Sequence, residues 1–422
     1  MKDFLIKGAT VLTLGSRTQN HPEADILVKG GIIAEVGPGV RSRSAEVVDG
    51  SNTIVMPGFV DAHRVCRVSL FKQEGLVPTG VEPSPDDVYA GTIVSLLSAA
   101  EAGVTTVVDW YDGPADPSHV SAALRAHDDS GLRTVLVLAA SEATVDVWHS
   151  AISEHGLRPT ERTVFAAGLP VFDEDGSLER SQSHVAELGL RLHLKGTEQD
   201  AGRFASSSDA FGDDLTVVHA NGLTDTDLDA IASSGAGVAL TPVADMTNGP
   251  GAPPMQDLLD RKIRPGLGVG DELQGPSDLL AQVRAAISIQ HATYFDRKLA
   301  GKGGLPNLLS TRDVIRYGTI DGANAVGLGA TTGSIEVGKQ ADLIMIRTDT
   351  PNLYPVNDPI GAIVWGIDTS NIDSVFVDGR PLMRSGVLDA DVTTVGSLVA
   401  DARKRMGVPT RRFVTATGGQ PQ

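Results

Sequence analysis

Short apolar runs alternate with segments of helical periodicity through the long central part of the chain. An apolar run that stops at glycine, proline or a polar cluster is typical of a buried strand, and apolar residues three and four apart are typical of an amphipathic helix. The pattern predicts strands at Gly58–Asp61, Val104–Trp110, Arg133–Ala139, Thr163–Ala167, Leu190–Lys195, Leu215–Ala220, Gly237–Leu240 and Gly266–Gly270. It predicts helices at Pro85–Ala102, Pro117–Ser130, Ser181–Leu188, Thr224–Ser233 and Ser277–Gln290, each with a terminal Ser, Thr, Pro or Gly signal.

Both ends of the chain follow the two-residue period of half-buried strands instead. Residues 4–36 contain several such stretches, with a hairpin signal at Gly30-Gly31, and residues 333–377 repeat the pattern. Two β segments that flank one long region favour a small sheet domain built from both termini. We therefore expect residues 1–56 and 331–390 to form a composite β-sandwich domain, and residues 391–422 to form a C-terminal helix with a mobile tail.

Eight strands with intervening helices match a (β/α)₈ TIM barrel, which we place at residues 57–330. An open, doubly wound parallel sheet is the alternative. No G-x-G-x-x-G follows the first central strand, and this absence argues against a dinucleotide-binding fold. The sequence therefore predicts an α/β protein whose function lies at the C-terminal ends of the barrel strands.

The amino-acid composition limits the classes of molecule that the protein is expected to bind. Hydrophobic residues make up 41% of the 422 residues, enough for a large core, and the net charge of −18 repels nucleic acid and anionic membranes. A small-molecule substrate is therefore the expected partner. The single cysteine, Cys66, excludes an internal disulfide framework and suits a reducing compartment. With no apolar run near the ~18 residues of a spanning helix and no signal-peptide pattern, we expect a cytoplasmic protein.

The first central strand ends in a polar cluster. The segment 57–63 reads Pro-Gly-Phe-Val-Asp-Ala-His, and it resembles the first barrel strand of the amidohydrolase superfamily, in particular the cytosine deaminase and triazine hydrolase branch. The resemblance extends along nearly the whole chain, from Phe4 to Gly379. It implies the TIM barrel, the composite terminal sheet and a catalytic metal held at strand ends, where it would generate hydroxide from bound water.

The resemblance also assigns roles to residues. His63 matches the first metal ligand, His193 the third, and Asp271 a ligand that also serves as general base. His219 matches the histidine that orients the hydroxide or the tetrahedral intermediate. We therefore expect His63, His193, His219 and Asp271 to converge on one pocket as catalytic residues.

Two positions depart from the family pattern. The first strand of the family ends His-x-His, but this chain has Val65 at the second histidine. The deaminases carry His-x-x-Glu after the fifth strand, but this chain has Gly196 at the glutamate. A site that has lost one ligand and its proton shuttle should bind metal less tightly. We therefore expect no cofactor, or a single divalent zinc or iron ion at reduced affinity on His63, His193 and Asp271.

The leading hypothesis is an atypical, metal-independent enzyme of the amidohydrolase fold. It would act on a small organic molecule, such as a specialised metabolite, by acid–base chemistry: hydrolysis, elimination or cyclisation. One alternative is a conventional metal-dependent hydrolase or deaminase of C–N or C–halogen bonds that uses the three remaining ligands. A second alternative is a non-catalytic descendant that binds a small molecule.

Four further residues are candidates for substrate binding: Arg64, Trp110, Lys195 and Met246. Arg64 suits either a substrate carboxylate or a structural salt bridge. Lys195 points the same way as His193 if the strand continues that far, and it suits either an oxyanion or a solvated loop. Met246 lies in a Gly- and Pro-containing segment, residues 241–250, which we expect to be a loop that closes over substrate. The fold by itself suggests a homodimer.

Overall fold

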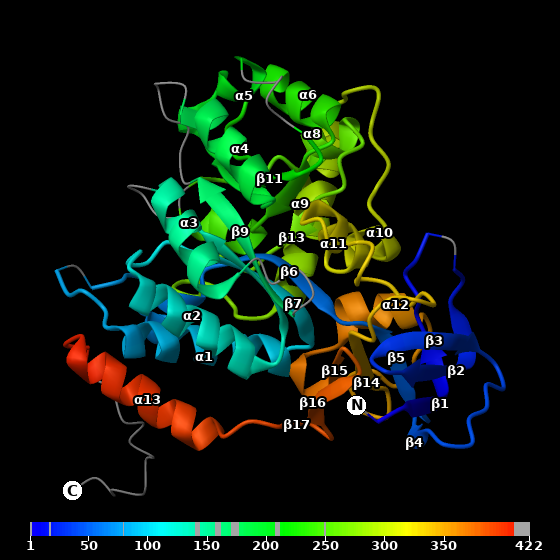
Figure 1. Ribbon diagram of the computed structural model, residues 1–422. Helices are drawn as coiled ribbons and strands as arrows, with labels where there is room; N and C mark the ends of the chain where they lie inside the picture. Colours follow the sequence, from blue (N-terminus) through cyan, green and yellow to red (C-terminus); the bar gives the residue numbers. More distant parts are fainter. Residues whose placement is uncertain are drawn as a thin grey trace, which may run out of the picture.

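The computed structural model describes residues 2–408, apart from residues 17, 79, 140–143, 157–161, 170–176, 207–211 and 249. The last residues, 409–422, which include the predicted mobile tail, lie outside the described part of the chain. Helix α13 (Val392–Arg405) forms where a C-terminal helix was expected, and it packs along helix α1 (Pro85–Glu101) (Figure 1).

A parallel eight-stranded sheet forms the centre of the molecule, and its strands pair in sequence order (Figure 1). The sheet closes on itself through main-chain hydrogen bonds of 2.9 Å, from the Val65 amide to the Gly270 carbonyl and from the Gly270 amide to the His63 carbonyl. The predicted (β/α)₈ barrel is therefore confirmed. Its strands are β6 (Phe59–Arg64), β7 (Val104–Tyr111), β8 (Arg133–Leu138), β9 (Thr163–Leu169), β10 (Leu192–Gly196), β11 (Leu215–His219), β12 (Gly237–Leu240) and β13 (Gly266–Leu267).

Local sequence signals set the start of several outer helices. Ser84 caps α1, and its side chain and the Asp87 carboxylate satisfy each other's backbone amides in a capping box. Thr224 and Asp227 repeat this arrangement at α6. The remaining helices are α2 (Pro117–Ser130), α3 (Thr144–His155), α4 (Ser177–Leu188), α5 (Arg203–Ser206), α6 (Asp225–Ser234), α7 (Pro242–Asn248), α8 (Met255–Asp260), α9 (Leu279–Leu299), α10 (Thr311–Tyr317), α11 (Ile320–Ala325) and α12 (Pro359–Gly361), with shorter turns η1 (Cys66–Phe71), η2 (Glu198–Asp200), η4 (Ala362–Gly366) and η5 (Thr369–Asn371).

The two chain ends share a second sheet, which is mostly antiparallel (Figure 1). Within the described residues it has nine strands, and β5 of the first segment pairs with β14 of the last one, from Leu343 opposite Pro57 to Arg347 opposite Thr53. The tight turn at Gly30-Gly31 joins two of them, as the sequence predicts. Its strands are β1 (Phe4–Val11), β2 (His21–Lys29), β3 (Ile32–Gly37), β4 (Glu46–Asp49), β5 (Thr53–Pro57), β14 (Leu343–Arg347), β15 (Ile372–Val377), β16 (Arg380–Arg384) and β17 (Val387–Leu388).

The segment after β12 differs from the prediction. Residues 242–248 form helix α7 instead of an open loop. Pro242 takes the first helical position, where its missing N–H costs nothing, and the Asp245 amide donates to the Thr241 carbonyl at 2.9 Å. The glycine and proline content of this segment suggested a loop, but its Thr-Pro start is a helix signal.

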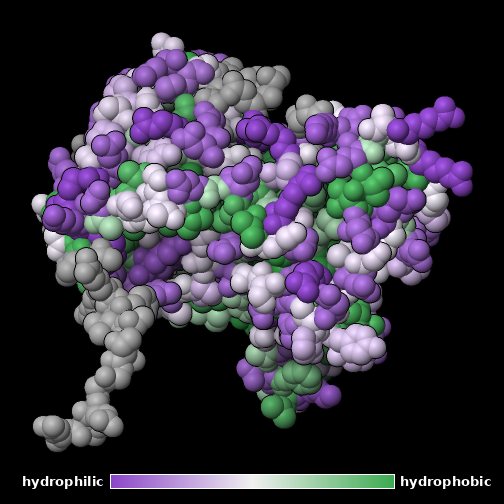
Figure 2. Space-filling view, turned by 90° about the horizontal axis from the view of Figure 1, so that it is seen from below, coloured by the Kyte–Doolittle hydropathy of each residue, from purple (hydrophilic) through white to green (hydrophobic). Residues whose placement is uncertain are grey.

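The surface is mixed. On the face seen in Figure 2, hydrophilic residues cover most of the area, and the hydrophobic patches between them are small. Across the described ranges, none of the helices is both long enough and apolar enough to cross a bilayer.

Candidate functional site

A cavity of about 200 Å³ opens at the C-terminal ends of the barrel strands. This end of a TIM barrel is where active sites form, because loops from all eight strands meet there. Three of the four predicted catalytic residues line the cavity. Its walls are His63, Val65, Lys195, His219, Ala244, Asp245, Asn248, Pro250, Gly270 and Asp271.

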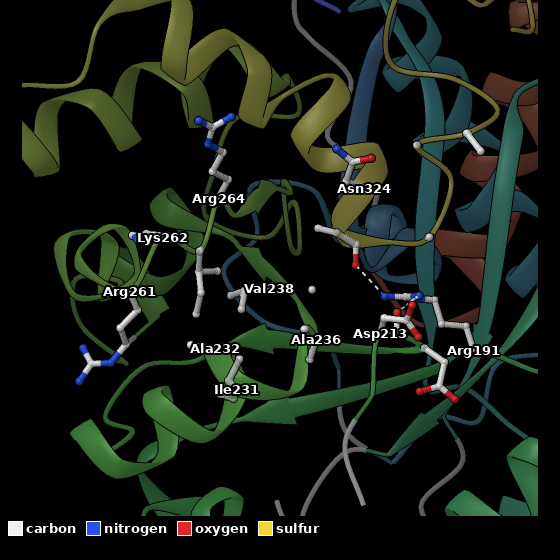
Figure 3. Close-up of a pocket in the computed structure, with 18 residues that line it drawn as sticks. Arg191, Asp213, Ile231, Ala232, Ala236, Val238, Arg261, Lys262, Arg264 and Asn324 are labelled. Atoms are coloured by element: carbon white, nitrogen blue, oxygen red, sulfur yellow. Dashed lines mark hydrogen bonds between the residues drawn. The ribbon is translucent and has the colours of Figure 1, made fainter. Parts of the chain in front are cut away.

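A larger groove, of about 750 Å³, lies at the opposite end of the barrel, below the N-terminal ends of β10 to β13 (Figure 3). Its arginines serve the fold. The Arg191 guanidinium donates to the carbonyls of Asp213 at 2.7 Å and Leu215 at 2.9 Å, and Arg261 pairs with the carboxylates of Asp225 and Asp229. None of the predicted catalytic residues lines this groove.

His219 ends β11 in a strained backbone conformation. Its φ is +76° and that of Ala220 is +67°, a region that non-glycine residues rarely adopt and that gathers at functional sites. The turn presents the imidazole to a buried acceptor: Nδ1 donates to Asp245 Oδ1 at 2.9 Å, and Thr241 Oγ1 donates to the same oxygen at 2.8 Å. Because Nδ1 then carries the proton, Nε2 is left as a proton acceptor.

His63 lies beside His219, with ring centroids 5.2 Å apart and the planes nearly perpendicular. It is 1% exposed, and its Nδ1 has no hydrogen-bond partner in the described residues. Burial lowers the pKa of His63 well below its usual range, and electrostatic interactions with His219, Lys195 and His193 lower it further. His63 is therefore a neutral imidazole at pH 7.

His193 does not reach the cavity. In the parallel register His193 pairs with Thr216, whereas Gly196 pairs with His219, so His193 lies three residues deeper in the barrel. Both of its ring nitrogens are buried without a partner, and burial lowers the pKa of His193 to about 3. The four predicted catalytic residues thus divide into three at the cavity and one below it.

The missing glutamate after β10 has left no space behind. A Cβ atom placed on Gly196 would lie 3.1 Å from both Phe204 Cζ and Val217 Cγ1, which is closer than side chains normally pack. Position 196 therefore faces the outer helices, where buried Phe204 fills the available space. A longer side chain here would have to displace that ring.

Lys195 does point inward, as the strand alternation predicts. Its Nζ lies 4.6 Å from the centroid of the Trp110 ring, and it lines the cavity together with His63. Trp110 is fully buried on β7 and packs edge-on against His63, with ring centroids 5.7 Å apart. Burial lowers the pKa of Lys195, while the charges on Asp112 and Asp271 partly oppose that shift.

Asp271 stands on the cavity wall contributed by the chain after β13. Asn248 Nδ2 donates to its Oδ2 and the Leu273 amide donates to its Oδ1, both at 3.0 Å. Asn248 comes from α7, whose exposed Met246 does not line the cavity. The expected contact between substrate and Met246 therefore has no support in the geometry, whereas Asn248 and Asp245 of the same helix both reach the cavity.

Arg64 belongs to a buried charge network beneath the cavity rather than to its wall. Its guanidinium donates to Asp61 at 2.8 Å and to Glu272 at 2.9 Å, and Ser95 donates to Glu272 at 2.6 Å. Burial alone would raise the pKa of Glu272, but the charges on Arg64 and Lys72 lower it to about 2. Of the two roles that the sequence left open for Arg64, the structure shows the salt bridge.

Sequence reasoning missed four residues that shape this end of the barrel: Thr241, Asp245, Asn248 and Glu272. A Thr-Pro helix start, with a carboxylate four residues after the threonine, could have indicated Asp245 as a partner for a strand-end histidine. Glu272 follows Asp271 directly in the sequence, but its side chain pairs with Arg64 instead of lining the cavity.

The residues that the family resemblance assigns to a metal do not form a complete ligand set in this arrangement. Among the described residues, no three His, Cys, Asp or Glu side chains gather closely enough to hold an ion. His193 lies below the cavity, Val65 offers no donor, and both Asp271 oxygens already accept hydrogen bonds. The Lys195 ammonium, which lines the same cavity, would also repel a cation.

Comparison with known proteins agrees with the fold. The amidohydrolase family profile matches residues 176–382. A 5'-deoxyadenosine deaminase of Methanosarcina mazei is 24% identical over 91% of this chain and 93% of its own length. A 5-methylthioadenosine/S-adenosylhomocysteine deaminase of Pyrococcus horikoshii is 26% identical over 93% and 96%, respectively.

Solved structures give the same result. An adenosine deaminase from Xanthomonas campestris with bound zinc superimposes with a TM-score of 0.82 at 20% identity, covering 96% of this chain and 99% of the other. An atrazine chlorohydrolase from Arthrobacter aurescens, complexed with zinc, gives a TM-score of 0.81 at 23% identity over 96% and 100%. The closed barrel, the shared terminal sheet and the strand-end histidines agree with these matches, and the chain is similar in fold to proteins of the amidohydrolase superfamily.

Proposed function

We propose that this protein is a hydrolase that cleaves a carbon–nitrogen bond in a small organic molecule at the C-terminal end of the barrel. The relatives support this reaction. Several of them are deaminases by name, and they favour the first alternative, a conventional metal-dependent hydrolase or deaminase, over the leading hypothesis of metal-independent hydrolysis, elimination or cyclisation. The small cavity suits a substrate of modest size.

The observation that carries the proposal is the hydrogen-bonded chain from Thr241 through Asp245 to His219. Asp245 is fully buried and fixes the imidazole so that Nε2 can accept a proton at the cavity. A positioned histidine of this kind contributes about 10²–10⁴-fold to a rate through general acid–base catalysis. The buried carboxylate also stabilises the imidazolium that forms during the reaction.

The chemistry balances with this chain's own groups. Nε2 of His219 takes a proton from water while the water oxygen bonds to the electrophilic carbon of the substrate. The carbon–nitrogen bond then breaks with its electron pair on nitrogen, and the His219 imidazolium returns the proton to the departing amine. Asp271 can accept a hydrogen bond from the substrate or the water on the opposite wall of the cavity.

A metal-assisted form of the same hydrolysis is the second candidate. The observation that favours it is the set of buried ring nitrogens without partners, one on His63 and two on His193. Buried polar atoms normally have hydrogen-bond partners or ligands. Two of the similar solved structures, the adenosine deaminase and the atrazine chlorohydrolase, contain zinc. Metal content, measured by plasma mass spectrometry on the purified protein, separates the two candidates.

The test measures ammonia release from a panel of aminated heterocycles and nucleosides, including 5'-deoxyadenosine and 5-methylthioadenosine. The wild-type protein is assayed both after chelation and with added zinc. We expect His219→Asn to lower kcat/KM by at least ~100-fold. His21→Asn, on β2 of the terminal sheet, serves as the matched control and should leave turnover unchanged. Equal turnover by the wild type and His219→Asn would overturn the proposal, and so would an absence of ammonia release across the panel.

A further inference from the structure

Lys195 is held in place at the cavity by its strand and by an aromatic floor. It follows His193 by two residues on β10, so both side chains point into the barrel, while Leu194 packs outward in the hydrophobic core. The Lys195 Nζ rests 4.6 Å from the centroid of the Trp110 ring. An ammonium group against the face of a buried indole is attracted by the ring electrons and has little freedom to move.

The ammonium has no acceptor of its own. Within the described residues, no hydrogen bond or ion pair to Lys195 is formed, although Lys195 lines the cavity. The carboxylates that line the cavity form no hydrogen bond with it: Asp245 Oδ1 accepts from His219 and Thr241 while Oδ2 has no partner in the described residues, and Asp271 accepts from Asn248 and Leu273. The three N–H donors of the Lys195 ammonium therefore face the cavity without a hydrogen bond to any described protein acceptor.

The other charged groups near Lys195 do not provide that acceptor. Asp112 and Asp271 act on its pKa only through space, and Asp112 is paired with Arg67 at 2.7 Å. His63 lines the same cavity, but no hydrogen bond joins it to Lys195 in the described residues. A nearly buried ammonium without a partner is costly, so a ligand that supplies an anionic oxygen gains more here than it would in water.

We infer that Lys195 is the resident cation of this cavity, in the place of a metal ion, and that it binds a carboxylate of the substrate. The substrate class is then a small amine- or amide-bearing carboxylate. The inference rests on the proposed function, because it names the class of molecule that the hydrolytic site accepts. A fixed cation also offsets the overall charge of −18, which otherwise disfavours an anionic substrate.

The test measures binding and needs no turnover. The probes are matched pairs of small molecules, benzoate with benzamide, nicotinate with nicotinamide and glutarate with glutaramide, followed by saturation-transfer NMR and thermal shift. We expect the wild type to bind at least one carboxylate at least tenfold more tightly than its amide. Lys195→Met should remove that preference, Lys195→Arg should retain it within a few-fold, and Lys298→Met in α9 should leave it unchanged.

Three results would overturn the inference: amides that bind as well as carboxylates, no carboxylate binding at all, or a preference that survives in Lys195→Met. A zinc titration provides an independent check. One equivalent of zinc that binds the wild type and is lost in His63→Asn would also overturn the inference, because the cavity would then hold a metal ion as its cation. A failure of carboxylate binding would leave hydrolysis of neutral amines in place, and a failure of hydrolysis would leave the binding result standing.

Discussion

The two ends of the barrel differ in how their polar groups are satisfied. At the N-terminal end, the larger groove is built on Arg191 and Arg261, whose guanidinium groups are matched by carbonyls and carboxylates (Figure 3). At the C-terminal end, the smaller cavity has His63 Nδ1 without a partner, and the Lys195 ammonium forms no hydrogen bond or ion pair within the described residues. The end of the barrel that is suited to chemistry is therefore distinguished by polar atoms that lack hydrogen-bond partners, and not by the volume of its cavity.

The same contrast holds for buried charge. Beneath the cavity, Arg64 is fully enclosed with Asp61 and Glu272, whereas Arg261 pairs with two largely exposed carboxylates on the groove side. A buried pair is costly to break because the remaining charge has no water, while an exposed pair contributes little. The network thus links β6 to the segment after β13.

The largest expected effect among the variants that probe this contrast is that of Arg64→Leu. Removing the guanidinium leaves Asp61 buried without its ion-pair partner and leaves Glu272 with Lys72 alone, so we expect the free energy of unfolding to fall by about 3–5 kcal/mol. Arg261→Leu should cost less than about 1 kcal/mol. Differential scanning calorimetry of both variants decides the matter, and equal losses at the two sites would refute the contrast.

The barrel was predictable because parallel strands leave a clear record in the sequence. Each strand is buried on both faces, so it reads as a continuous apolar run between glycine, proline or polar residues. The family resemblance pointed to His63, His219 and Asp271, and they lie together because the C-terminal ends of parallel strands converge at one end of the barrel. Here the order of residues along the chain translates directly into position.

Other parts of the site depend on packing that no local pattern records. His193 lies below the cavity because of its register against β11. Gly196 at the end of β10 faces Phe204, which comes from helix α5. Asp245 reaches His219 across 26 residues of sequence, through a helix that was expected to be a loop. The two family departures were visible in the sequence, but only the structure shows that Lys195 lines the same cavity as Val65.

Gly196→Glu gives an intermediate effect and tests whether the lost carboxylate can simply be restored. A side chain at position 196 meets Phe204 and Val217 at 3.1 Å already from its Cβ atom. Overpacking of this kind costs about 1–3 kcal/mol, so we expect a lower melting temperature and no gain in ammonia release. Gly196→Ala is the graded control and should cost less. A stable Gly196→Glu variant with increased turnover would show that the glutamate can still enter the cavity.

The smallest effect, and one of opposite sign, is expected for His193→Leu. Its two buried nitrogens lack partners, and removing an unsatisfied buried polar group recovers about 1–3 kcal/mol, less the cost of imperfect packing. We expect the melting temperature at pH 7.5 to rise by about 1–2 °C. A drop in melting temperature, together with loss of bound zinc, would instead make His193 a metal ligand.

The advantage of His193→Leu should grow as the pH falls. The pKa of His193 is about 3 in the folded protein, against an ordinary value of 6.5, so the unfolded chain binds more protons between these values. The wild type therefore loses stability as the pH drops from about 6.5 toward 3, and this part of the loss is absent in the leucine variant. Melting curves at pH 7.5, 6 and 5 test the sign. If the difference in melting temperature between the two proteins stayed constant across that range, His193 would titrate normally. The polar environment at this end of the barrel would then extend deeper than the cavity.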